Sequence, residues 1–165
     1  MNAAHIHLMV NHLPLFAALF AGAILAFGLW RRQTTLVNTA LVLAVVAGLG
    51  AVLAAQTGER AEEIAEGLPA VAEATIESHE EAAEAAMISA IALGIVALMA
   101  LAVPARLAVA KRMAAIGSLA LVVVTFGLVA RTADLGGEIR HSEIADAGSP
   151  FQSGDADEDR EEIEH

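Results

Sequence analysis

The chain has 165 residues, of which 57% are hydrophobic and 18% charged, and its formal net charge is −11. Soluble domains average about 45 to 50% apolar and about 25% charged residues, so this composition excludes an ordinary soluble domain. The absence of cysteine excludes disulfides, thiolate metal sites and c-type haem, and the acidic charge excludes nucleic acid as a favourable partner.

Four stretches of the chain hold no charged residue, and each is long enough to cross a bilayer. A helix rising about 1.5 Å per residue needs roughly 17 to 25 residues for a hydrocarbon core of about 30 Å. The sequence therefore predicts an all-α integral membrane four-helix bundle over residues 1–145, followed by an acidic, disordered tail at 146–165. The predicted spans are about 12–31, 35–56, 83–105 and 112–132, with a helical connection at 57–82.

Basic residues indicate how the bundle is oriented. The short loops at 31–35 and 106–112 carry five basic residues and no acidic ones. The positive-inside rule predicts that these loops are cytoplasmic and that both termini lie on the outer, periplasmic side of a bacterial inner membrane. All six histidines and all 20 acidic residues then fall on the outer side, so we expect the functional chemistry there.

Histidines cluster before the first span. His5, His7 and His12 lie within eight residues of one another. Asn11 is a favourable N-cap and Pro14 is tolerated in a first helical turn, so we expect the first membrane helix to begin near Asn11 or His12. His7 and His12 are candidate ligands, and the alternative is that they only make hydrogen bonds at the membrane interface. For His5 that alternative is favoured.

The connection after the second span is rich in glutamate. Its acidic residues recur at helical spacing, which predicts a short amphipathic helix ended by Gly67 and Pro69. The simplest interpretation is a solvated acidic face, and Glu59 is the best candidate ligand because it lies closest to the membrane. The residues at this spacing are Glu59, Glu62, Glu63 and Glu66.

His79 lies on an apolar face of the helix that we predict from about residue 70 into the third span. An imidazole on an inward face needs a partner, and small neighbours leave space for one. That space would be filled by a phenylalanine from another helix, a carboxylate or a flat cofactor. The neighbours at helical spacing are Thr75, Ile76, Ala82, Ala83 and Ala86, whereas Glu73, Glu77, Glu80 and Glu84 form a separate, water-facing stripe.

The fourth span ends in a glycine pair. Gly136 and Gly137 predict a helix stop, because glycine readily adopts the left-handed conformation. Glu138 and His141 beyond them have the Glu-x-x-His spacing of a di-iron site. Such sites need two copies of this motif and two further glutamates, so the single copy disfavours a di-iron protein.

The opening motif, His7-x(4)-His12-x-Pro14, resembles that of a bacterial family of four-helix predicted membrane proteins of unknown function. The resemblance extends through residues 57–59, 62–63, 79–84 and 135–141, with Leu8 in place of the family's usual proline. It implies the fold and the membrane location, and it carries over no reaction.

The preferred hypothesis is a small membrane protein that holds haem b, or a transition metal, at the outer ends of its helices for electron transfer. Its partners besides lipid would be a quinol, a soluble cytochrome or a larger membrane complex. His12 and His79 are the first choice of axial pair, with His7 and His141 as alternates or supporting partners. A bare metal ion would draw on the same four histidines together with Glu59 and Glu80.

The competing hypothesis is a non-catalytic accessory or scaffold subunit that binds no cofactor. A carrier of metal ions or protons is disfavoured, because no ionisable residue lies inside an apolar stretch. No nucleophile, base and orienting residue form a recognisable set, so an enzyme is not predicted.

Overall fold

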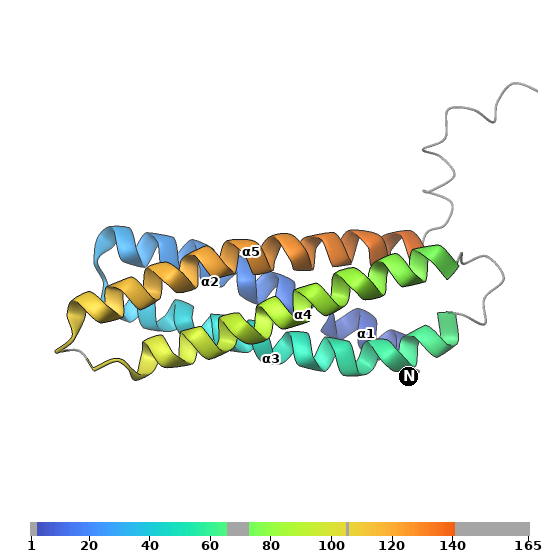
Figure 1. Ribbon diagram of the computed structural model, residues 1–165, viewed down its shortest axis with the longest axis horizontal. Coiled ribbons are helices and arrows are strands. Elements are labelled where there is room, and N and C mark those ends of the chain that lie inside the picture. Colours follow the sequence, from blue (N-terminus) through green and yellow to red (C-terminus); the bar gives the residue numbers. More distant parts are fainter. Residues whose placement is uncertain (1–2, 66–72, 105, 141–165) are drawn as a thin grey trace, which may run out of the picture.

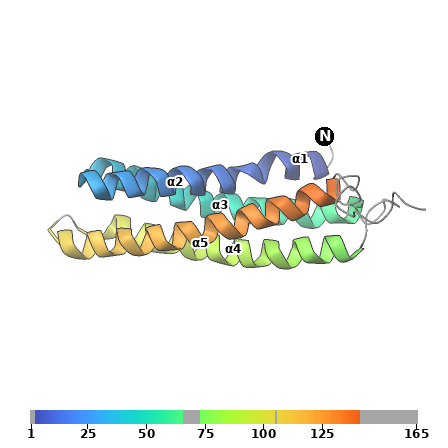
Figure 2. The ribbon, with the colours of Figure 1, turned by 90° about the horizontal axis from the view of Figure 1, so that it is seen from above.

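The computed structural model describes residues 3–65, 73–104 and 106–140, and the regular structure in these ranges is entirely helical. The helices form an elongated antiparallel bundle, in which α1 and α2 follow one another along one edge (Figures 1 and 2). The predicted all-α fold is therefore confirmed. The elements are α1 (Ala3–Val10), α2 (His12–Arg31), α3 (Thr34–Ala65), α4 (Glu73–Ala102) and α5 (Ala108–Arg140).

Four helical stretches among the described residues are long and apolar enough to cross a membrane. Large apolar side chains such as Phe20, Leu49 and Val123 are exposed on the outside of the bundle. A continuous apolar exterior of this kind suits hydrocarbon rather than water. The protein is therefore a multi-pass membrane protein whose helices contact the lipid bilayer. The stretches are His5–Arg31, Thr34–Ala61, Ala74–Ala102 and Ala108–Gly137.

The four long helices pack as a square. α2 lies against α3, α3 against α4, α4 against α5, and α5 against α2, so α2 and α4 occupy opposite corners. α1 packs mainly on α3. Small side chains such as Ala18, Ala44 and Ala90 are fully buried between the helices, and they let the helix axes approach closely.

α3 and α4 approach each other closely at a pair of glycines, Gly48 and Gly94. A β-carbon at Gly48 would lie 2.8 Å from the carbonyl oxygen of Ala90 and 3.3 Å from the Cα of Gly94. Both of these atoms belong to the main chain, which cannot move aside as a side chain can. The α3–α4 spacing therefore depends on the missing side chain at Gly48.

Asn11 does not cap α2, so that part of the prediction is wrong. Its backbone is helical, with φ −61° and ψ −22°, and its side chain makes no cap hydrogen bond. Its main-chain N–H instead donates to the carbonyl of His7, at 2.9 Å. A side-chain cap is not needed at Asn11, because α1 lies immediately before α2 and its His7 carbonyl accepts the hydrogen bond from the Asn11 N–H.

Two further helix boundaries differ from the prediction. α3 runs without a break to Ala65, so the acidic segment after residue 58 extends the second span rather than forming a separate short helix. α5 runs through Gly136 and Gly137 to Arg140, and neither glycine has a positive φ, so the predicted stop is wrong. The predicted helix end at 67–69 and the tail at 146–165 lie outside the described residues.

A buried hydrogen bond joins α4 to α5 inside the bundle. The hydroxyl oxygens of Ser89 and Thr125 are 2.8 Å apart, and Thr125 is fully buried. Thr125→Val keeps the shape but removes the hydroxyl. We expect it to lower the free energy of unfolding by about 0.6 kcal/mol, the average for such bonds between membrane helices.

Unfolding in mixed micelles measures this change. The Ser89→Ala and Thr125→Val double variant is expected to lose less than the sum of the two single changes. Strict additivity would show that the two hydroxyls do not interact.

Candidate functional site

The two ends of the bundle differ in their charged residues. The end formed by the connections α2–α3 and α4–α5 carries Arg31, Arg32, Arg106, Lys111 and Arg112. At the opposite end α1 and α4 begin and α3 and α5 end (Figure 1). That end holds every histidine and carboxylate in the part of the chain that the structure describes, and it is called the histidine end below.

His7 in α1 is half-buried and turned toward α3. Its Nδ1 lies 3.0 Å from the carbonyl oxygen of Ala54 and 3.2 Å from Oγ1 of Thr57. A carbonyl oxygen can only accept, so Nδ1 carries the proton and donates it. The Thr57 hydroxyl donates to main-chain carbonyls of its own helix, and its lone pair therefore supports the same donor. In the neutral ring, the free lone pair is on Nε2.

His79 in α4 is held in the same way by α5. Its Nδ1 donates to the carbonyl oxygen of Thr132 at 3.0 Å. On the same helix face Ile76 and Ala86 are buried, while Glu80 is exposed on the other. The prediction that His79 faces inward is confirmed.

Each imidazole lies against a glycine, four residues after the carbonyl that it contacts. A β-carbon at Gly58 would be 3.3 Å from Cε1 of His7. One at Gly136 would be 3.0 Å from Cε1 of His79 and 3.3 Å from its Nδ1. The same local unit, a histidine that donates to a carbonyl and packs on a glycine, thus occurs once between α1 and α3 and once between α4 and α5.

Both units lie at the histidine end of the bundle. When both rings are protonated, the charge of His79 repels that of His7. The carboxylate of Glu80 also acts electrostatically on His79. Within the described residues neither Nε2 has a hydrogen bond. Two imidazoles from opposite sides of the bundle therefore keep their Nε2 atoms free for a ligand.

His12 has a different environment. It is exposed, and its Nδ1 donates to the carbonyl of Leu8 in the preceding turn, at 3.0 Å. Its ring stacks on Phe16, with the centroids 6.2 Å apart. The interactions of His12 are thus within its own segment of the chain, whereas His7 contacts another helix, α3.

The other candidate ligands do not gather around this pair. Glu59 and Glu80 are exposed, and His141 lies outside the described residues. No group of three or more His, Asp or Glu side chains in the described ranges is arranged to hold a metal ion. Within the described residues, His7 and His79 therefore remain the candidate ligand pair.

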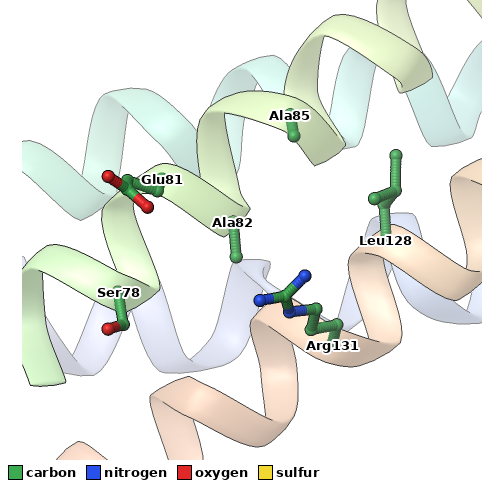
Figure 3. Close-up of a pocket in the computed structure, with 6 residues that line it drawn as sticks. All are labelled: Ser78, Glu81, Ala82, Ala85, Leu128 and Arg131. Carbon is green, nitrogen blue, oxygen red and sulfur yellow. The ribbon is translucent and has the colours of Figure 1, made fainter.

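A pocket of about 200 Å³ lies between α4 and α5, and one of its lining residues, Ser78, precedes His79 in the chain. In Figure 3 the side chain of Arg131 extends from α5 toward Ala82 on α4. The sequence analysis did not predict this pocket. The end of the apolar stretch, between Leu128 and the first charged residue, Arg131, could have indicated a site at this level of α5. The lining residues are Ser78, Glu81, Ala82, Ala85, Leu128 and Arg131.

The glycines beneath the imidazoles were also missed as site residues. Gly58 follows a threonine on α3, and Gly136 lies four residues after Thr132 on α5, so both are glycines near the histidine end of a long helix.

No family model matches the chain, and no curated protein or solved structure matches it. Its assignment as a multi-pass membrane protein rests on the four apolar helices themselves.

Proposed function

We propose that the protein binds haem b at its histidine end, with His7 and His79 as axial ligands, and that it transfers electrons at the outer face of a membrane. One observation carries this proposal. Two half-buried imidazoles, on opposite sides of the bundle, each have Nδ1 fixed by a main-chain carbonyl and Nε2 free.

The residues fit such a group in their chemistry. An axial histidine coordinates through one ring nitrogen, and a hydrogen bond from the other fixes the tautomer and the orientation of the ring. The Ala54 and Thr132 carbonyls supply that bond. The absence of side chains at Gly58 and Gly136 leaves space for each ring beside its carbonyl, since an added β-carbon would crowd the ring at 3.3 Å and 3.0 Å, respectively. When bound, haem supplies a one-electron redox centre.

The orientation of the protein supports an outward-facing role. The connections at the end opposite the histidines carry basic residues and no acidic ones. By the positive-inside rule that end is cytoplasmic, and the histidine end and both termini are periplasmic. An electron carrier at this site would exchange electrons with partners outside the cytoplasm.

A second candidate function is that of an accessory or scaffold subunit without a cofactor. The same hydrogen bonds favour it, because each one fastens two helices together whether or not a ligand is present. The two functions differ in what happens at Nε2. Only the cofactor protein requires both nitrogens to be engaged by the same group.

Absorption spectra of the detergent-purified protein, oxidised and then reduced with dithionite, test the proposal. We expect a Soret band that sharpens and shifts on reduction. His7→Ala and His79→Ala should each lose it, because each removes one axial nitrogen. His12→Ala is the matched control and should keep the band, since His12 is exposed and bonded within its own segment.

Two results would overturn the proposed ligation. Colourless protein from haem-replete cells, with His7→Ala and His79→Ala changing stability alone, would favour the accessory subunit. A spectrum that is lost in His12→Ala but retained in His7→Ala would assign the axial position to His12 instead.

A further inference from the structure

The pocket between α4 and α5 lies where both of its helices change from apolar to charged. On α5, Leu128 belongs to the last apolar stretch and Arg131 is the first charge after it. On α4, Glu81 precedes the charge-free stretch, whose first residue is Ala85. A ligand in this pocket would therefore have its polar part at the level of the lipid head groups and an apolar part among the acyl chains.

The lining offers both a hydrogen-bond donor and acceptors. The guanidinium of Arg131 can only donate hydrogen bonds, and the ionised carboxylate of Glu81 can only accept them. The Ser78 hydroxyl donates to the carbonyl of Ala74 at 2.9 Å, so its oxygen has lone pairs left to accept. One cation and one anion suit a neutral ligand that carries both hydroxyl donors and oxygen acceptors.

The size and floor of the pocket suit a single ring. Ala82, Ala85 and Leu128 supply an apolar surface without bulky side chains. A cavity of about 150 Å³ holds benzene, so the volume of about 200 Å³ accommodates one substituted ring. A phospholipid phosphate would gain Arg131 but stand beside the Glu81 carboxylate, which repels it.

Two lining residues of the pocket are sequence neighbours of the contact between His79 and Thr132. Ser78 precedes His79 in α4, and Arg131 precedes Thr132, whose carbonyl accepts from His79. A ligand held by Ser78 and Arg131 would thus lie on the other side of the same α4–α5 contact. Figure 3 shows both elements that it would touch.

From these observations we infer that the pocket between α4 and α5 binds the head group of a membrane quinol or quinone. The inference rests on the proposed function, since electron transfer is what requires such a partner. Arg131 donates to a ring oxygen, Glu81 and Ser78 accept from a hydroxyl, and the apolar floor takes the ring.

Equilibrium dialysis in detergent, which measures the binding of a short-tailed quinone analogue to the purified protein, tests this inference. We expect saturable binding of one molecule per chain. Arg131→Gln and Glu81→Gln should each weaken binding about tenfold or more, because each leaves one polar contact unmade. Arg60→Gln and Glu77→Gln are matched controls, since both side chains are exposed at the same end and outside the pocket, and they should bind as the unchanged protein does.

The outcomes separate this inference from the proposed function. Haem-containing protein that binds no quinone, or binds it equally well in all four variants, overturns the pocket alone. Quinone binding by a protein without haem, lost in Arg131→Gln, supports the pocket and overturns the haem site. Displacement of bound quinone by short-chain phosphatidylethanolamine at equal concentration would reassign the pocket to a lipid head group.

Discussion

Gly136→Val is expected to remove the contact between His79 and Thr132 and to abolish the proposed haem binding. A β-carbon at position 136 would lie 3.0 Å from Cε1 of His79, and the branched side chain of valine adds further atoms on the same side. The imidazole then has to leave the Thr132 carbonyl, which fixes its tautomer. The loss is read as haem per protein in the absorption spectrum.

Gly137→Val is the matched control for this change. Position 137 is exposed, and a β-carbon there meets no atom within 4 Å. Both substitutions make the same change in the same turn of α5, so their helix propensities cancel in the comparison. Equal haem content and equal thermal stability in the two variants would show that the His79 contact does not depend on Gly136.

Gly48→Val is expected to destabilise the bundle by about 3 kcal/mol, the upper part of the usual range for an overpacked core. The added β-carbon would be 2.8 Å from the Ala90 carbonyl oxygen, so α3 and α4 must separate along their contact. Because the small buried residues nearby are packed for that spacing, the separation also opens voids around them. Unfolding in mixed micelles measures the loss.

The control for Gly48 is Gly127→Val, in the apolar stretch of α5. A β-carbon at Gly127 meets no atom within 4 Å, so its valine projects away from the packed helices. We expect it to change the free energy of unfolding by less than about 0.5 kcal/mol, as surface substitutions usually do. Similar losses in both variants would mean that glycine matters at position 48 for some reason other than helix packing.

The overall fold follows from the sequence because a membrane leaves few choices. A charge-free stretch of the right length has to become a helix, since hydrocarbon offers no other partner for its main-chain polar groups. The inward face of His79 was predictable for a similar reason. Thr75, Ile76 and the alanines around it share one side of the helix, and the glutamates share the other.

The contact of His7 with α3 was harder to predict. Asn11 is a residue type that often caps helices, and interpreting it as a cap made His12 the first histidine of the bundle. In the structure the helical backbone instead continues through Asn11. As a result α1 packs on α3, and His7 of α1 contacts α3. Its acceptor is the main-chain carbonyl of Ala54, and a carbonyl is present at every residue, so no side-chain pattern could identify it.

Glycine also has two uses that a single sequence does not separate. It permits a left-handed turn, and it lets another group approach the backbone. The first use led to the predicted stop at Gly136, and the second is what the structure shows there. The deciding fact is the position of His79, more than 50 residues earlier in the chain.

The repeated unit of histidine, carbonyl and glycine has a consequence for how the protein matures. One unit is complete within α1 to α3 and the other within α4 and α5, so the first unit is synthesised before the second. A group bound by both imidazoles would join the part of the bundle formed by α1 to α3 to the part formed by α4 and α5. By mass action, at a free concentration 100 times its dissociation constant, it would stabilise the joined form by about 2.7 kcal/mol. Loading of the cofactor and completion of the bundle would then be a single, coupled event.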